Sequence, residues 1–502
     1  MDAQEKERPA GDTSNEGNVA HDVESNINPG GTSDLEWKND RHNPYNWPKA
    51  KKYVQLMTIM SIAFTCSLGT SIISPAHTSL MTEFEISSTA AFLPLSLYTF
   101  ALGLGPVLGG PLSEVAGRQA VFAMAVVLGG LFAMGSGLTN SFAGLCVMRF
   151  LSGFVYGPSL SIGSGVLQET YLPIERGLPS AIYILSPFLG PGLGPVLGVF
   201  LVARKSWRWT QYTIALFSAW SAVWMLFSRE SYHPVIKRRR MKQLGLDTPA
   251  RPPLSKALHK FLTVDLLRPV HMLLTEPIVM FICLYIACVF GTLYMFFGTF
   301  FYIFQTTYHY TLIQCGLVFL AIAVGCLVGF FLIGISDKLL YQPKATKFPL
   351  HQIPAEYRLY PAMAGSFVLP VSLFWFGWTV QKGVNPAAPI VAIVLFGIGN
   401  IGLFISCMQY GECSIHEALK SDIGDAYHSS NVASASSANS LARYTFAAAF
   451  PFFSIQMYTA LGTGWASSVL GFLSVALLPV PWILFKYGHR IRAMSKYETA
   501  SY

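Results

Sequence analysis

The chain has 502 residues, of which 52% are hydrophobic and only 12% are charged, and its formal net charge at neutral pH is +8. Soluble proteins carry about 25% charged residues, whereas this sequence repeats uncharged apolar runs of about 20 residues, each long enough to cross a bilayer. The composition excludes a large soluble enzyme and predicts an all-α integral membrane protein. Because the basic residues lie between the apolar runs, the positive charge does not indicate a nucleic-acid partner.

The eight cysteines show neither metal-ligand nor disulfide spacing, and most lie in or beside apolar runs. We therefore expect free, buried thiols. The sequence also contains no phosphate loop, nucleotide fingerprint or metal cluster. These observations argue against an enzyme and predict no cofactor and no metal.

Residues 1–48 are polar and acidic and are expected to form a disordered cytosolic tail. Twelve candidate spans follow, near residues 53–75, 90–110, 119–138, 142–166, 178–202, 211–228, 277–304, 313–334, 360–380, 387–410, 432–457 and 464–486. The longest polar break separates six spans from six. The predicted organisation is an N-terminal six-helix bundle (49–228), a central cytosolic loop (229–275), a C-terminal six-helix bundle (276–486) and a cytosolic tail (487–502).

The distribution of Lys and Arg predicts the orientation of the chain, because cytosolic loops carry an excess of positive charge. With both termini in the cytosol, 28 of the 34 basic residues lie on the cytosolic side. The remaining six either face outside or fall within spans: Arg204, Lys205, Arg208 and Lys382 outside, Arg149 and Arg443 within. The reverse orientation would place the 28 residues outside and is rejected.

The heptapeptide GLGPVLG occurs twice, at residues 103–109 and 192–198, in the second and fifth predicted spans. A six-span half built from two inverted three-helix repeats pairs its second span with its fifth. The two copies therefore indicate internal repeats of this kind.

Small residues recur every four positions around the second copy, at Gly190, Gly194 and Gly198. This spacing places them on one helix face, where they allow two membrane helices to approach closely. Three prolines, at 187, 191 and 195, follow the same spacing, and each removes an amide donor and bends the helix. Ordinary helix packing is the alternative to a transporter bundle that rocks.

Residues 190–199 resemble the antiporter motif of drug:proton exporters in the major facilitator superfamily, G-x-x-x-G-P-x-x-G-G. The match comprises Gly190, Gly194, Pro195 and Gly198, with Val199 in place of the last glycine. Residues 109–119 resemble the superfamily's loop between the second and third spans. Gly110, Leu112, Gly117 and Arg118 match, while Glu114 replaces Asp, and Val115 and Gln119 replace basic residues.

Residues 147–157 are similar to the fourth-span motif of the same superfamily, with Arg149 and Gly153. Other stretches resemble fungal members of the twelve-span branch, from about residue 43 to the end, including NPYNWPKAKKY, SWRWTQY, RESYHPVI, AEYRLYPAM and KYGHRIRAMSKY. The resemblance implies the major facilitator fold, with two six-helix bundles and twelve transmembrane helices. It also implies proton antiport with alternating access, powered by the proton gradient.

The resemblance assigns roles to individual charges. Glu114 and Arg118 are expected to form a charge relay that latches one access state, and Arg149 is expected to take part in proton coupling. The alternatives are a topological anchor for Arg118 and a structural salt bridge for Arg149. No predicted span has a carboxylate at its midplane, so the titrating candidates are Glu114, Glu169, Glu230 and Glu276 at span ends, with His77 and His309 outside.

The seventh span is rich in aromatic residues, with Tyr285, Tyr294, Phe297 and Phe301 at helical spacing. Such side chains form an apolar surface with a few hydroxyls and suit amphipathic ligands, although lipid-facing or core packing is the alternative. Further candidates for a substrate cavity are the polar or aromatic residues Tyr98, Gln168, Asn400, Gln409 and Asn439. Relative to the family, residues 411–422 resemble an insertion, either a retained intron or a regulatory loop.

The sequence therefore predicts a monomeric, multi-pass efflux transporter of hydrophobic or amphipathic small molecules in the plasma membrane, with the vacuolar membrane as the alternative. Its expected partners are the substrate, protons and the lipid bilayer. Other interpretations are a polyamine or organic-cation exporter of the same fold, a gradient-independent facilitator, and a nutrient importer or sensor. Cation recognition is weakened by the lack of midplane carboxylates, and neither terminus is long enough to suggest a sensor.

Overall fold

We describe the protein from a computed structural model of the chain. The structure describes residues 37, 40–172, 175, 177–243, 267–347, 354–418 and 425–492, without the side chains of 108, 110, 111, 114, 115, 267, 268, 345, 412–418, 425–435 and 492. Most of the predicted disordered tail and part of the central loop therefore lie outside the described residues. Of the predicted insertion, residues 411–418 continue the preceding helix to Ala418, and residues 419–422 lie outside the described residues.

Every regular element in these ranges is helical, as the apolar runs predict. The first half contains η2 (Pro44–Asn46), α3 (Lys49–Ser71), η3 (Ser74–Ala76), α4 (His77–Phe84), η4 (Ala90–Phe92), α5 (Leu93–Ala116), α6 (Arg118–Leu138), α7 (Phe142–Thr170), α8 (Gly177–Arg204), α9 (Arg208–Phe227) and α10 (His233–Gln243). The second half contains α12 (Leu267–Thr275), α13 (Pro277–Tyr308), α14 (Leu312–Val318), α15 (Leu320–Ser336), η6 (Asp337–Tyr341), α16 (Gln342–Ala345), η7 (Ala355–Leu359), α17 (Tyr360–Gln381), α18 (Ala387–Ala418), α19 (Asp425–Leu477) and α20 (Pro479–Arg492).

Ten helical segments of the described chain are long and apolar enough to cross a membrane. The ten segments correspond to the twelve predicted spans because one predicted span is not counted and one segment contains two. The 20-residue helix α9 coincides with the predicted sixth span but is not among the ten segments. The segment Ser436–Ile491, counted once, is interrupted at Gly462, where a φ of 73° breaks the helix between the two last predicted spans. The structure is consistent with twelve spans.

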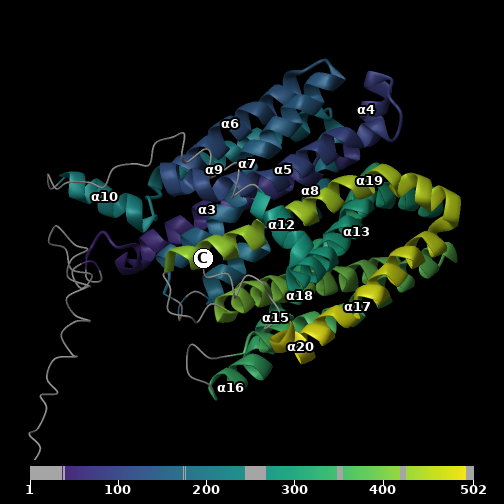
Figure 1. Cartoon of the computed structure of the whole chain (residues 1–502). Coiled ribbons are helices and arrows are strands. Elements are labelled where there is room, and N and C mark those ends of the chain that lie inside the picture. The colour runs from purple at the N-terminus through teal and green to yellow at the C-terminus, as the bar shows by residue number, and fades with distance from the viewer. Residues whose placement is uncertain are drawn as a thin grey trace, which may run out of the picture.

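The helices fall into two groups, which Figure 1 shows as purple-to-blue helices and teal-to-yellow helices. In the N-terminal helix group, α3 and α5 to α9, the strongest contacts join α5 to α7, α3 to α8, and α6 to both α7 and α9. In the C-terminal helix group, α13 to α20, α13 packs on α19, and α17 and α18 pack on each other. The groups meet where α5 contacts α19 and where α8 contacts α14 and α15.

The aromatic helix α13 lies inside the protein rather than facing lipid. Every residue from Tyr285 to Phe300 is buried. Large apolar side chains on other helices are exposed instead, as expected for the lipid-facing surface of a membrane protein, for example Leu216 and Leu226 on α9 and Phe331 on α15. Lipid contact therefore does not account for the aromatic character of α13.

Candidate functional site

Arg149 in α7 is completely buried and is held by oxygen atoms from three other helices. Its Nη2 donates a hydrogen bond to the Gly69 carbonyl at 2.7 Å, its Nε to the Pro94 carbonyl at 3.2 Å, and its Nη1 to Gln211 Oε1 at 3.4 Å. The guanidinium carbon lies 4.3 Å from the centre of the Tyr98 ring. No described carboxylate pairs with Arg149, so carbonyl dipoles and one aromatic face compensate the buried charge.

Tyr98, predicted as a cavity residue, is placed by the structure in this arginine shell. Its side chain is fully buried, and its hydroxyl donates to the Cys66 carbonyl at 2.9 Å. Gly153, the glycine one turn after Arg149, allows α5 to approach α7, because a Cβ there would overlap the Tyr98 carbonyl. The fourth-span motif therefore combines a buried cation with the space that its aromatic partner requires.

A second charged cluster lies at the junction of α5 and α6. Arg118 binds Glu169 of α7 through Nε at 3.0 Å and Nη2 at 2.8 Å, and both side chains are only 14% exposed. The Arg118 guanidinium also donates to Ser113 and lies over the Tyr232 ring, 4.8 Å from its centre. The other oxygen of Glu169 accepts from Ser231 at 2.7 Å. The predicted relay arginine is thus paired with Glu169, and the surroundings of Glu114 and Gly110 lie outside what the structure describes.

Glu230 completes this cluster by capping α6. Its Oε1 accepts from the Arg118 amide at 2.9 Å, and its Oε2 accepts from the Gln119 amide at 3.2 Å. A carboxylate at a helix N-terminus binds unpaired amides and favours the helix dipole. Gly117 provides the space, because its φ is 93° and a Cβ there would overlap Glu230. The sequence suggested Glu230 only as a titrating candidate, since its partner amides are more than 100 positions away.

The antiporter motif packs α8 tightly against α3. A Cβ at Gly190 would lie 2.6 Å from Ser67 Oγ, and Cβ atoms at Gly194 and Gly198 would overlap Ser71 and the Ile72 carbonyl, respectively. The three glycines therefore form one contact face, as their spacing predicts. Substitution of any of them would separate the two helices.

A proline of α8 frees one backbone oxygen atom that α3 then binds. Pro191 has no amide hydrogen, so the carbonyl of Pro187, one turn earlier, loses its normal intrahelical donor. The Ser67 hydroxyl donates to that carbonyl, and Ser71 donates to the Gly190 carbonyl at 3.1 Å. Ser67 thus satisfies the carbonyl that proline frees, and Ser71 adds a second bond between the helices; the sequence analysis assigned neither role.

The two GLGPVLG copies use the same positions for the same contacts. In the first copy, Gly105 contacts Gly157 and Gly109 contacts Pro158, both on α7 of the same helix group. In the second copy, the equivalent Gly194 and Gly198 contact α3, again within the group. The third and seventh residues of the repeat therefore hold each group together.

The first glycine of each copy faces the other helix group instead. A Cβ at Gly103 would lie 2.6 Å from the Tyr444 Cβ on α19. A Cβ at Gly192 would lie 2.9 Å from the Ala323 Cβ on α15. In each copy of the heptapeptide, the third and seventh residues therefore pack within one helix group, and the first residue contacts the other group.

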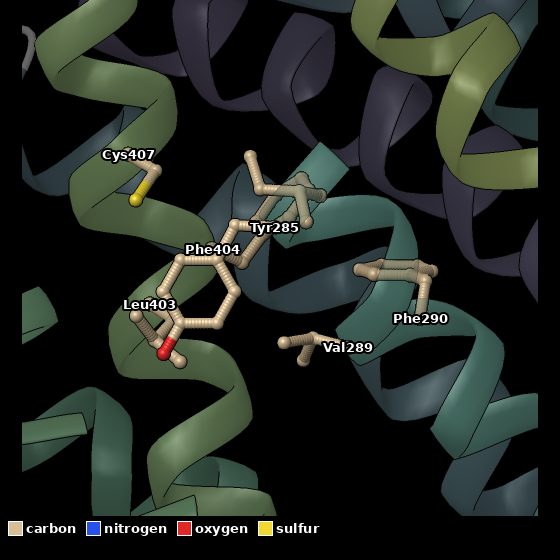
Figure 2. Close-up of a pocket in the computed structure, with 7 residues that line it drawn as sticks. Tyr285, Val289, Phe290, Leu403, Phe404 and Cys407 are labelled. Carbon is tan, nitrogen blue, oxygen red and sulfur yellow. The ribbon is translucent and has the colours of Figure 1, made fainter. Parts of the chain in front are cut away.

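A small apolar cavity lies between α13 and α18, with side chains of both helices directed into it (Figure 2). Its volume of about 10 Å³ corresponds to one water molecule. It is lined by apolar and aromatic residues, including Tyr285, Phe290 and Phe404. Phe188 of α8 packs across these rings, with its centroid 4.6 Å from that of Phe404 and 5.6 Å from that of Phe290. A side chain of the N-terminal helix group therefore borders the aromatic cluster of the C-terminal group.

The other predicted cavity residues take different positions. Tyr294 donates to Thr70 Oγ1 at 2.9 Å and so links α13 to α3, and Phe297 packs on Phe319 inside the C-terminal group. Asn400 and Asn439 are buried on α18 and α19. Gln168 is exposed at the end of α7. Of the predicted polar set, the buried asparagines thus lie on helices that border the aromatic cluster, and Gln168 does not.

Two groups of apolar helices that meet along closely packed faces, with buried cations and an aromatic cluster near their contact, define a helical membrane transporter. The sequence model of the Major Facilitator Superfamily matches residues 59–420. The chain belongs to this superfamily. It is similar in fold to the D-xylose-proton symporter, with a TM-score of 0.61 and 16% sequence identity over 86% of this chain and 97% of that chain.

Two fungal relatives are similar along most of their length. The chain is 33% identical over 468 residues to the efflux pump FUB11 of Gibberella moniliformis, covering 91% of this chain and 76% of that protein. It is 32% identical over 500 residues to polyamine transporter 4 of Saccharomyces cerevisiae, covering 93% of this chain and 74% of that protein. Both relatives are transporters by name, and the chain is a multi-pass transporter of the fungal efflux branch of this superfamily.

Proposed function

We propose that the protein exports hydrophobic or amphipathic small molecules across the plasma membrane by proton antiport with alternating access. The observation that carries this proposal is the aromatic cluster of α13 and α18, which is bordered by Phe188 from the opposite helix group. Aromatic walls suit ligands with large apolar bodies. A site bordered by both groups changes its exposure when the groups rock against each other.

The remaining charges have roles that suit such a cycle. Arg149 links helices of the N-terminal group, and the Arg118–Glu169 pair with Glu230 ties the end of α5 to α7 and to the segment after α9. Ionic contacts at helix ends are discrete and can favour one of two states. Proton coupling itself is supported by the resemblance of residues 190–199 to the antiporter motif.

Polyamine export is the second candidate, because one relative is a polyamine transporter by name. A polycation would require carboxylates along its path. None of the residues that line the aromatic cluster is a carboxylate, and the guanidinium of Arg443 contacts its rings. The buried carboxylate Glu276 lies at the start of α13, outside the residues that line the cluster. This charge distribution favours export of neutral or acidic amphipathic molecules.

The test is efflux of Nile red, a neutral amphipathic dye, from energised cells that express the chain, with and without a protonophore. We expect extrusion that collapses with the proton gradient and is lost in Arg149→Ala at normal surface expression. The exposed Arg204 gives a matched control, so Arg204→Ala should extrude the dye normally. If extrusion persists with the protonophore, proton antiport is wrong and facilitated export explains the transport.

A further inference from the structure

A second buried arginine, Arg443 on α19, differs from Arg149 in its polar contacts. Its side chain is only 8% exposed, yet its Nε has no hydrogen-bond partner. No described carboxylate lies within ion-pairing distance of it, in contrast to Arg118. An arginine buried inside a membrane protein normally finds acceptors for its donors, because an unpaired charge there is costly. Arg443 therefore has unused capacity to bind an anion.

Three aromatic rings surround the guanidinium of Arg443. Its central carbon lies 4.8 Å from the ring centre of Phe290, 4.9 Å from that of Phe404 and 4.5 Å from that of Tyr444. Ring faces attract a cation and compensate part of its desolvation, but they accept no conventional in-plane hydrogen bonds. The rings thus hold the arginine in the protein interior and leave its Nε without an acceptor.

Further unpaired polar atoms lie on α19, which carries Arg443, and on α13 and α18, which carry Phe290 and Phe404. Asn439 precedes Arg443 by one helical turn, and its Oδ1 has no partner. Asn400 precedes Phe404 by one turn on α18, and neither its oxygen nor its nitrogen is paired. The hydroxyl of Tyr285 on α13 is also unpaired. Buried polar atoms are normally paired, so this concentration points to a ligand with polar groups.

The apolar cavity described above adjoins this arginine through shared walls. Phe290 and Phe404 both line the cavity and contact the guanidinium of Arg443. The cavity has a volume of about 10 Å³, so a ligand larger than water enters only when the walls separate. Phe188 belongs to the other helix group, and rocking of the groups would withdraw it from these rings.

We propose that Arg443 is the anion-recognition residue of the substrate site and binds the carboxylate of an acidic, aromatic amphipathic substrate. The planar guanidinium matches a carboxylate in two parallel hydrogen bonds. Phe290, Phe404 and Phe188 contact the apolar body of the ligand. The unpaired amide of Asn400 and the unpaired oxygen of Asn439 offer a donor and acceptors to its other polar groups. This inference deepens the proposed export function and rests on it.

The test uses three probes with nearly the same apolar body: naphthaleneacetate, neutral naphthaleneacetamide and cationic naphthylethylamine. Each is titrated by calorimetry into the purified full-length protein in detergent at neutral pH, where the acid is ionised. We expect the wild type to bind naphthaleneacetate about tenfold more tightly than the amide, because a charge-assisted bidentate contact is added. The amine should bind more weakly than both.

Arg443→Gln should bring the acid-to-amide affinity ratio to about one while retaining binding of the amide. Arg443→Lys keeps the charge but loses the planar fork, so it should retain part of the preference, and it serves as the measured variant if the glutamine variant does not fold. Lys382→Gln removes an exposed cation and is the matched control, with an unchanged ratio. An acid-to-amide affinity ratio in Arg443→Gln equal to that of the wild type overturns the proposal. If only Arg443→Lys folds, a wild-type ratio in that variant overturns it. A wild type that does not prefer the acid also overturns it.

Transport of the same probes separates this inference from the export function. Proteoliposomes that hold the wild-type protein are given a proton gradient, and movement of each probe is followed. Gradient-driven transport of the amide without preference for the acid overturns the role of Arg443 and leaves the export function standing. Absence of transport for all three probes overturns both. Preferred transport of the acid, lost in Arg443→Gln, supports both.

Discussion

Arg149 and Arg443 are the same residue type at similar burial, but their surroundings are opposite. Arg149 donates to two backbone carbonyls and one side-chain oxygen, and these bonds join helices of the N-terminal group. Arg443 lies among three rings with its Nε unpaired. A buried charge whose donors are bound by its own protein stabilises the fold, whereas one that keeps an unused donor remains available to a ligand.

The same contrast extends to the helices around each arginine. Small residues and serine hydroxyls hold the N-terminal group together, as in the contact of α8 with α3. In the C-terminal group, the core around α13 is built from rings such as Phe296, Phe300 and Phe376. Short, directional contacts fix the geometry of one group, while apolar surfaces without directional bonds adapt to ligands of different shape.

The largest expected effect on stability comes from removing Arg149, whose donors are bound by carbonyl and amide oxygens. Arg149→Met should lower the free energy of unfolding by roughly 3 kcal/mol, because three hydrogen bonds with a charged donor are lost in a buried site. Arg149→Lys should recover only part of this loss, because an ammonium group does not reproduce the fork. Unfolding is measured by circular dichroism in detergent. If Arg149→Met were as stable as the wild type, Arg149 would not support the fold, and the proposed difference in role between Arg149 and Arg443 would be wrong.

The next effect concerns the cap of α6. Glu230→Gln keeps the shape of the side chain but removes its charge, so both amide contacts and the favourable interaction with the helix dipole weaken. We expect a loss of about 1 kcal/mol in the free energy of unfolding. The same change at the exposed Glu85 is the control and should have almost no effect. Equal stability of the two variants would contradict the capping role.

A smaller effect is expected at the contact between α3 and α8. Ser67→Ala leaves the Pro187 carbonyl without its hydroxyl donor, at a cost of about 1 kcal/mol. Thermal unfolding of this variant beside Ser79→Ala, which changes a half-buried serine of α4 for which the structure shows no side-chain hydrogen bond, measures the cost. If the two midpoints coincide, the freed carbonyl does not need its serine donor.

The smallest effect on stability is expected at Arg443. Arg443→Gln should change the free energy of unfolding by less than about 1 kcal/mol, because a hydrogen-bond donor without an acceptor contributes little and the charge is costly to bury. The measurement is the same unfolding experiment as for Arg149. A loss as large as that of Arg149→Met would show that Arg443 supports the fold.

The sequence predicted the helical membrane fold and the contact face of Gly190, Gly194 and Gly198, because both follow from local composition and spacing. It marked Arg149 as an intramembrane charge but could not name its acceptors, which are carbonyls from α3 and α5. Arg443 carried the same signal in the sequence. Its rings include Phe290 and Phe404, which are distant along the chain, so only the packing of α13, α18 and α19 distinguishes it from Arg149.

The central claim is that one buried arginine holds the fold and the other binds the substrate. The most direct measurement compares the thermal midpoints of wild type, Arg149→Met and Arg443→Met, each with and without saturating naphthaleneacetate. A ligand raises the midpoint of any variant that binds it in the folded state. We predict a lower midpoint without ligand only for Arg149→Met, and a smaller ligand-induced rise only for Arg443→Met. Equal destabilisation of both variants, or an undiminished rise in Arg443→Met, would contradict the account.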